Sequence, residues 1–322
     1  MKWYKLVFKQ EQPIHIGALK WGVINETEIF IPGWTMWGAL TNQFLRIKFK
    51  KIRNKNENEG KAEYPEKAES CDIERFKKFF ECITNFYPAL YRGEREEEIL
   101  LSDPLFPCCV RGIFHLGDYS EERFRFEFVD TFVSTAVESL SRRAKDESLH
   151  EFEYILPKSN LKQLHWVGLI GVGEEAHHEV EDFLKEFPEV YIGGDSRYGF
   201  GRLKLIGIEC LNDGGEERKN EGQQKNEELV AWGLDEDGCL YRDENDDGLV
   251  LRQFLEFSPE IKFEGEIKLI ADFDFTQNIP RVQKARYYIN IGSRVKVNDV
   301  SLSYDELKKY WLSKGKFIRI RP

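Results

Sequence analysis

One short stretch, residues 191–205, constrains this chain more than any other. It reads Tyr-Ile-Gly-Gly-Asp-Ser-Arg-Tyr-Gly-Phe-Gly-Arg-Leu-Lys-Leu, which places four glycines within nine residues. Glycine tolerates positive φ and allows another backbone to approach closely. Arg197 and Arg202 carry planar guanidinium groups that suit phosphate. The stretch therefore predicts a loop that lies against a polyanion at the edge of a sheet.

The length of 322 residues is enough for two compact domains. We expect a first domain over residues 1–210, a linker over 211–228 and a C-terminal α+β part over 229–322. No apolar run is long enough for a transmembrane helix, and the first nine residues alternate as a strand does, unlike a signal peptide. We therefore expect a cytoplasmic protein with no membrane partner.

The net charge of −10 comes from one region of the chain. Residues 211–260 contain 15 acidic and 5 basic residues. By contrast, residues 43–55 contain six basic residues and no acidic one, and residues 276–322 contain eleven basic and three acidic residues. Because basic residues that gather on one face can bind nucleic acid in an acidic protein, the charge does not exclude this class of ligand.

Apolar periodicity predicts the elements of the first domain. We expect strands at residues 2–9, 123–129, 163–172 and 202–209, and helices at 34–46, 72–89 and 174–187. This order predicts an α+β fold, a ferredoxin-like (RNA-recognition-motif-like) βαββαβ domain with insertions. Residues 53–70 are charged and are expected to form an inserted loop. The C-terminal part is interpreted as a second, smaller and degenerate ferredoxin-like unit.

Residues 130–155 predict a long projecting hairpin. Its middle carries Arg142, Arg143 and Lys145 among small polar residues, and its two ends are strand-like. Such a tip can grip the backbone of an RNA or a neighbouring protein. The alternative is an exposed loop whose basic residues are only solvated.

Three motifs, in this order along the chain, resemble the CRISPR-associated RAMP superfamily (repeat-associated mysterious proteins). The first is Pro13-Ile-His-Ile-Gly17 followed by Phe30-Ile-Pro-Gly-Trp-Thr-Met-Trp-Gly-Ala-Leu40, which is similar to the family's entry into its first helix. The second is residues 134–155, which resemble its central hairpin and contain Leu149-His-Glu-Phe-Glu153. The third is residues 193–202, which resemble its glycine-rich loop. The resemblance covers about residues 1–210.

The resemblance implies ferredoxin-like RNA-recognition folds that bind guide RNA. The long C-terminal part makes the chain most similar to the subunit that caps the 5′ handle of the guide in a type III effector. The implied partners are guide RNA, a neighbouring RAMP backbone subunit and the large polymerase-like subunit. The expected RNA-binding residues are Gly193, Gly194, Ser196, Arg197, Gly199, Gly201, Arg202, Arg142, Arg143, Lys145 and Trp34.

In the expected mode of binding, amide groups of residues 193–201 approach phosphates while Arg197 and Arg202 pair with them. Aromatic side chains such as Trp34 or Tyr198 would stack on bases. Both aromatics depart from the family pattern: Trp34 follows Pro32-Gly33 where a small residue is expected, and Tyr198 precedes Gly199. Trp34 can equally pack in the core.

No catalytic residue is singled out by the sequence. Metal-independent RNA cleavage needs a general base near the 2′-hydroxyl, and His15 is the one histidine at a suitable family position. A guide-processing endoribonuclease that uses His15 is therefore an alternative, as are a backbone subunit of the same complex and a protein-interaction module. The position of the glycine loop well before the C-terminus favours capping over cutting.

Neither a metal nor a cofactor is expected. The six cysteines contain no C-x-x-C pair, and Cys108 and Cys109 with His115 are the one cluster to check. The wide spacing favours ordinary buried thiols.

Overall fold

The computed structural model describes residues 1–58, 69–91, 103–194, 196–212, 227–241, 248–274, 279–296 and 307–320. Among these residues, no helix is both long and apolar enough to cross a membrane.

The centre of the molecule is a six-stranded antiparallel sheet. Its order is β4, β11, β1, β13, β12, and the short β10 also pairs with β11. The strands are β1 Lys2–Gln10, β4 Tyr87–Tyr91, β10 Lys158–Ser159, β11 Lys162–Val172, β12 Glu189–Tyr191 and β13 Arg202–Cys210. β1 is buried along nearly its whole length, so both faces of the sheet are covered.

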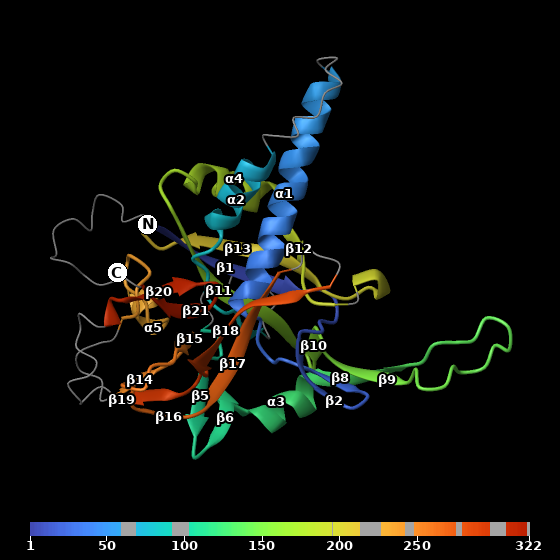
Figure 1. Cartoon of the computed structure of the whole chain (residues 1–322). Helices are drawn as coiled ribbons and strands as arrows, with labels where there is room; N and C mark the ends of the chain where they lie inside the picture. Colours follow the sequence, from blue (N-terminus) through green and yellow to red (C-terminus); the bar gives the residue numbers. More distant parts are fainter. Residues whose placement is uncertain are drawn as a thin grey trace, which may run out of the picture.

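Three helices pack together over one face of this sheet (Figure 1). They are α1 Gly33–Asn58, α2 Glu69–Phe79 and α4 His177–Glu186. The ring of Phe44 on α1 joins them, with centroids 5.3 Å from Phe76 and 5.2 Å from Phe183. The α+β class predicted from the sequence is confirmed, and β1, α1, β4, β11, α4 and β13 follow one another in βαββαβ order.

The C-terminal part covers the other face of the sheet. Trp232 packs against Tyr87 with centroids 5.8 Å apart, and the indole of Trp3 donates to the carbonyl of Glu236 at 2.9 Å. Lys5, only 5% exposed, lies 3.1 Å from the carboxylate of Glu228. The described residues on both sides of the predicted linker therefore share one buried core.

Within the C-terminal part, two further sheets follow the short helix α5, Glu227–Ala231. One has the order β17, β18, β15, β21, β20, and the other has the order β14, β19, β16. The strands are β14 Gly248–Val250, β15 Phe254–Glu256, β16 Phe263–Glu264, β17 Ile267–Asp274, β18 Arg281–Ile289, β19 Arg294–Lys296, β20 Tyr310–Ser313 and β21 Lys316–Arg319. A second ferredoxin-like unit stays a prediction, because residues 297–306 lie outside the described residues.

A four-stranded outer sheet extends from the molecule beside the main sheet (Figure 1). Its order is β2, β3, β9, β8, and a small sheet of β5, β6 and β7 lies near its base. Helix α3, Glu121–Phe128, connects the two. The strands are β2 Gly17–Trp21, β3 Ile24–Thr27, β5 Pro107–Val110, β6 Ile113–Leu116, β7 Tyr119–Ser120, β8 Val129–Ser134 and β9 His150–Ile155.

The strand expected at residues 123–129 was a wrong prediction, because this segment is helix α3. Ser120 caps the helix by accepting a hydrogen bond from the amide of Arg123, and Arg125 pairs with Glu121 one turn away. Phe124 and Phe128 are buried on one side, four residues apart. The strict alternation thus concealed a pair of aromatics at helical spacing.

The helix expected over residues 72–89 was also wrong in its second half. α2 ends at Phe79, and the chain then enters β4, which pairs with β11 as the second strand of the βαββαβ order. The inserted loop expected at 53–70 is reduced at both ends, because residues 53–58 belong to α1 and residues 69–70 to α2. Its centre, 59–68, and most of the predicted linker, 213–226, lie outside the described residues.

Candidate nucleic-acid interface

Two glycines of the loop that follows β12 have a steric reason to be glycine. Gly193 has φ 73°, and a Cβ there would lie 2.1 Å from the carbonyl oxygen of His15. Gly201 has φ 95°, and its Cβ would lie 2.3 Å from the carbonyl oxygen of Ile192. Both contacts are far closer than carbon and oxygen permit, so a side chain at residue 193 would separate the loop from His15, and one at residue 201 would separate the two ends of the loop.

The amide groups of the loop are used inside the protein. The amide of Gly194 donates to His15 O at 3.2 Å, that of Gly201 to Pro13 O at 2.8 Å, and that of Gly199 to Ser196 O at 3.2 Å. The expected cradle of amides around a phosphate is therefore corrected at these three glycines. The backbone that approaches this loop belongs to the protein itself.

The loop presents side chains instead. Residues Ser196–Tyr198 form one turn of 3₁₀ helix, η2, and all three are exposed, Tyr198 by 80%. The guanidinium of Arg197 has no ion pair with any described residue. Asp195, which precedes the turn, lies outside the described residues. A basic and an aromatic side chain thus stand together at the surface.

Arg202 has a different place from Arg197. Its guanidinium lies 3.1 Å from the carboxylate of Glu11 and 2.5 Å from that of Glu189. The hydrogen bond to Glu189 raises the pKa of this guanidinium. Two carboxylates therefore pair with Arg202 in this structure, and its expected contact with phosphate stays a prediction.

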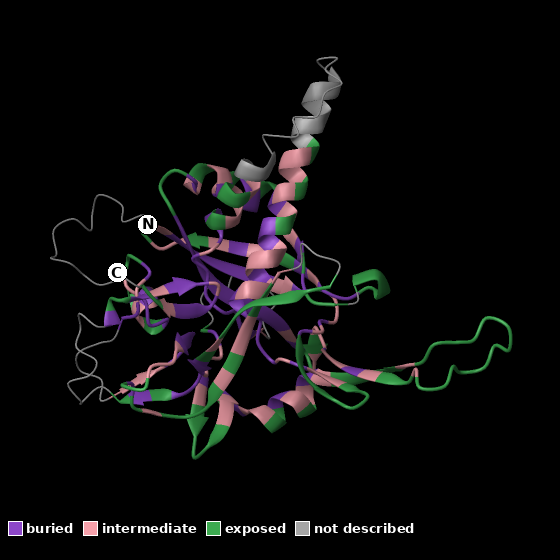
Figure 2. Cartoon of the chain, viewed as in Figure 1, coloured by how far each residue is buried: buried purple, intermediate pink, exposed green. Residues whose placement is uncertain are grey.

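The hairpin of β8 and β9 carries the basic residues of its tip into solvent. The strands pair from Val129 opposite Ile155 to Ser134 opposite His150. Beyond these strands, backbone hydrogen bonds still connect the two arms of the hairpin. For example, the amide of Lys145 donates to Ala136 O at 2.8 Å. Figure 2 shows the whole tip as exposed, and Arg142, Arg143 and Lys145 belong to it.

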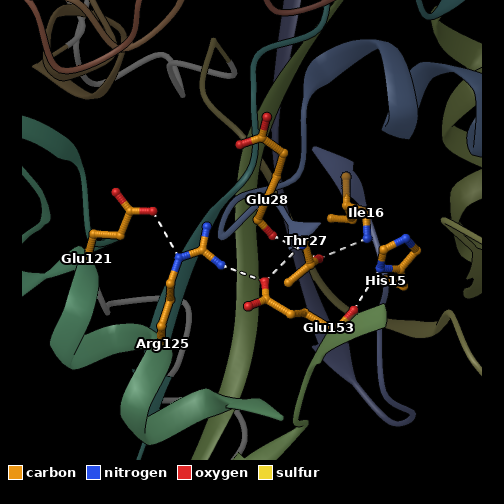
Figure 3. A network of polar contacts seen from close by, with 7 residues as sticks. All are labelled: His15, Ile16, Thr27, Glu28, Glu121, Arg125 and Glu153. Carbon is orange, nitrogen blue, oxygen red and sulfur yellow. Dashed lines mark hydrogen bonds and ion pairs between the residues drawn. The ribbon is translucent and has the colours of Figure 1, made fainter. Parts of the chain in front are cut away.

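A polar network fixes the base of the hairpin (Figure 3). Arg125 donates to Glu121 and to Glu153, both at 2.9 Å. The Glu153 carboxylate also accepts the amide of Thr27 at 3.1 Å, and its carbonyl oxygen lies 2.7 Å from Nδ1 of His15. Helix α3, strand β3, strand β9 and residue 15 are therefore tied together at this point.

One face of the hairpin is aromatic, and the glycine loop packs onto it. Phe152 is 5.3 Å from Phe132 and 5.6 Å from Phe200, between ring centroids. Tyr154 is 5.4 Å from Phe200, and the ring of His15 is 5.4 Å from Phe152. Phe132 remains 45% exposed. We call Phe132, Phe152, Tyr154 and Phe200 the aromatic face.

The aromatic face was missed by the sequence reasoning, although a signal was present. Phe152 and Tyr154 alternate with Glu151 and Glu153, and such alternation places the two aromatic residues on one side of a strand. Phe200 belongs to the glycine stretch itself. Burial, followed by the neighbouring charge of Asp130, raises the pKa of Tyr154.

Trp34 does not join this surface. Its ring lies 5.4 Å from that of Phe254 at an angle of 33°, and the ammonium of Lys316 lies 5.7 Å above it. The half-buried indole packs between the two parts of the chain, as the core alternative predicts, and its stacking on a base stays a prediction. Tyr198 keeps an exposed ring.

His15 is half-buried between the glycine loop and the hairpin. Because Nδ1 is bonded to the carbonyl of Glu153, only Nε2 is available for proton transfer. Of the cluster of Cys108, Cys109 and His115 singled out in the sequence, Cys108 lies opposite His115 in the β5–β6 pair. In the part of the chain that the structure describes, no three His, Cys, Asp or Glu side chains are grouped as a metal site requires.

Comparison with known proteins finds no matching family model and no matching curated protein. Among solved structures, the chain is similar to a chain of the Type III-B Cmr-beta complex bound to cognate target RNA and AMPPnP, at 11% identity and TM-score 0.46. This alignment covers 91% of the chain and 86% of the other. The same values of coverage and TM-score, at 12% identity, hold for the complex bound to cognate target RNA alone. In the apo state of the complex, a matched chain has 12% identity and TM-score 0.38, with coverage of 66% and 98%.

Proposed function

We propose that this protein is a non-catalytic guide-RNA-binding subunit of a type III CRISPR effector, which caps the 5′ handle of the guide and docks the large subunit. One observation carries the proposal. The glycine loop, with exposed Arg197 and Tyr198, packs through Phe200 onto the hairpin that carries the exposed ring of Phe132 and the exposed tip with Arg142, Arg143 and Lys145. Cations around an aromatic surface suit single-stranded RNA, because phosphates pair with the cations and bases stack on the rings.

Within this surface, some residues hold the glycine loop against the hairpin and others are exposed for binding RNA. The packing of Phe200 on Phe152 and Tyr154 holds the glycine loop at a fixed distance from the hairpin. Arg197 and the tip are then free to bind phosphates, while Phe132 and Tyr198 offer exposed rings. The motifs that resemble the RAMP superfamily supply this loop, this hairpin and the connection at residues 13–17, so the motif order and the surface agree.

The test is titration of the full chain with a labelled RNA that carries the repeat-derived 5′ handle, compared with a scrambled RNA of equal length. Loss of one phosphate contact in Arg197→Ala should weaken binding about fivefold at 0.1 M salt, since each contact contributes a slope of about 0.7 against log salt. Lys185→Ala on α4, whose exposed ammonium pairs with Glu181 at 2.6 Å, is the matched control and should bind like the unaltered chain. An affinity for the handle RNA that does not depend on salt concentration, or that is the same in Arg197→Ala as in the unaltered chain, would contradict the proposal.

His15 favours one alternative, a metal-independent endoribonuclease that processes the guide. Its ring is oriented by the carbonyl of Glu153 and borders the aromatic face, where an RNA would lie. Incubation with repeat RNA in the presence of a chelator tests this alternative. Cleavage that is lost in His15→Ala but retained in His115→Ala, which alters a half-buried histidine of β6, would establish it. A backbone subunit would be distinguished by several copies of the chain along one guide.

A further inference from the structure

We propose that the outer sheet has a second functional face, opposite the aromatic face, which docks a protein segment with apolar residues and a lysine or arginine. The inference rests on the proposed function, because it requires neighbouring subunits. Strand register defines the face. Trp21 pairs with Ile24, Ile24 pairs with Glu151, and Glu151 pairs with Val133, which makes one row across all four strands. We call these four residues the docking row.

The apolar members of the docking row are unusually exposed. Trp21 is 63% exposed, Val133 55% and Ile24 39%. The other six tryptophans of the chain are buried or half-buried. Directly paired residues on adjacent strands share a face and have close Cβ atoms, so Trp21 and Ile24 form a continuous apolar surface, and Val133 extends the row beyond Glu151. Contiguous apolar surface of this kind marks an interaction site.

Glu151 decides which partner fits. Its backbone is fixed, because its amide donates to Val23 O at 2.9 Å and its carbonyl accepts from the Asn25 side chain at 3.0 Å. Its half-buried carboxylate has no ion pair with any described residue, whereas the carboxylate of Glu153, two residues further, pairs with Arg125. A carboxylate between two apolar side chains attracts a cation and repels phosphate.

The negative charge of Glu151 therefore excludes two other occupants of this face, RNA and a second copy of this chain. RNA would place its phosphates against Glu151. A two-fold contact with a second copy would bring the two Glu151 carboxylates toward one another, because such an interface uses the same patch twice. An apolar protein segment with one basic residue satisfies both the exposed side chains and the carboxylate.

The experiment is reconstitution of the effector from the purified neighbouring subunits, guide RNA and this full chain, with assembly measured by mass photometry. In Glu151→Lys the affinity for the partial complex should fall by at least about tenfold, since a like charge now faces the partner's cation. Glu175→Lys is the matched control, because it makes the same charge change on an exposed residue that precedes α4, outside the outer sheet and its tip. Both variants should bind the handle RNA as the unaltered chain does.

Trp21 supplies a direct optical readout. Its fluorescence should shift to shorter wavelength when the partner subunits are added, and Trp21→Phe should lose this shift. Equal assembly of Glu151→Lys and the unaltered chain would overturn the inference, as would a Trp21 shift caused by RNA alone or by raising the concentration of this chain alone. If the unaltered chain binds no RNA and joins no complex, the proposed function fails instead.

Discussion

Two long antiparallel strand pairs of the described residues, β8–β9 and β17–β18, use similar side chains in opposite ways. In β8–β9 the basic residues stand at an exposed tip, and the aromatic face is partly covered by the glycine loop. In β17–β18 the charged face turns inward: Lys268 pairs with Glu28, Arg286 with Glu256 at 2.5 Å, and Asp272 with Lys316 at 2.8 Å.

The outward face of β17–β18 is apolar as a consequence. Leu269 lies opposite Tyr287 and Phe273 opposite Val282, and these four are 57%, 59%, 50% and 56% exposed. The number of basic residues in a segment therefore does not measure how much positive charge is free to bind a ligand. Residues 276–322 are strongly basic in sequence, yet Arg286, Lys296, Lys314 and Lys316 are all paired with carboxylates. The RNA site proposed above accordingly lies on β8–β9 and not on β17–β18.

The largest expected effect separates the hairpins by RNA affinity. Replacing Arg142, Arg143 and Lys145 together by alanine should weaken RNA binding about 100-fold at 0.1 M salt and reduce the salt slope by about 2, because three phosphate contacts are lost. Arg281→Ala combined with Lys284→Ala, on exposed residues of β18, should change affinity less than about threefold. Fluorescence anisotropy over a range of salt concentrations measures both. Similar losses from the two hairpins would remove the distinction drawn between them.

The second effect concerns stability. Arg286→Ala should lower the free energy of unfolding by about 1–3 kcal/mol, because it leaves the largely buried carboxylate of Glu256 without its ionic partner. Urea denaturation followed by circular dichroism measures this loss. Arg143→Ala, at the exposed tip, should stay within about 0.5 kcal/mol of the unaltered chain. A stable Arg286→Ala variant with impaired RNA binding would reverse the roles assigned to the hairpins.

The third effect depends on pH and uses two adjacent residues of β18. Tyr288 is buried, and this burial, with Glu256 nearby, raises its pKa to about 12. The unfolded chain ionises this phenol near its ordinary value of about 10, so it loses the proton first and stability falls as pH rises from about 10 to 12. Tyr288→Phe should flatten this part of the alkaline decline. Tyr287→Phe, on the exposed side of the same strand, should leave it unchanged, and equal curves for both variants would contradict the inward placement of Tyr288.

The smallest effect tests the outward face of β17–β18. Leu269→Gln should change the free energy of unfolding by no more than about 0.5 kcal/mol, because the side chain is mostly exposed already. Ile289→Gln, on a fully buried residue of the partner strand, is the contrasting variant and should destabilise strongly. Thermal unfolding distinguishes them. A large loss in Leu269→Gln would mean that this face is covered in solution.

Much of the main sheet could be predicted from the sequence, because its strands and helices have clear periodicity and lie in βαββαβ order. β4 could not, since the apolar residues that precede it, Phe80, Ile83 and Phe86, continue the helical spacing of α2 beyond its end at Phe79. Only the pairing of β4 with β11 decides between helix and strand there. Helix α3 was missed for the converse reason, because Phe124 and Phe128 satisfy both periods.

The candidate site was predictable in place but not in detail. The glycines correctly predicted that another backbone lies close to this loop. The sequence did not indicate that this backbone is that of residues 13–15. Arg197 and Arg202 are five residues apart with the same chemistry, and only the fold places Glu11 and Glu189 beside one of them. Pairing of this kind depends on residues distant in sequence, which local pattern does not contain.

The start of helix α1 has a consequence for how the chain folds. A Cβ on Gly33 would lie 2.4 Å from the amide nitrogen of Gly315, and Asn85 joins both, since it accepts the amide of Gly33 at 2.8 Å and donates to the carbonyl of Gly315 at 3.2 Å. The last of these bonds spans 230 residues of sequence. On the ribosome, the first helix is therefore made long before the turn that completes its N-terminal contacts, and this late closure should make folding slow and dependent on the last hairpin.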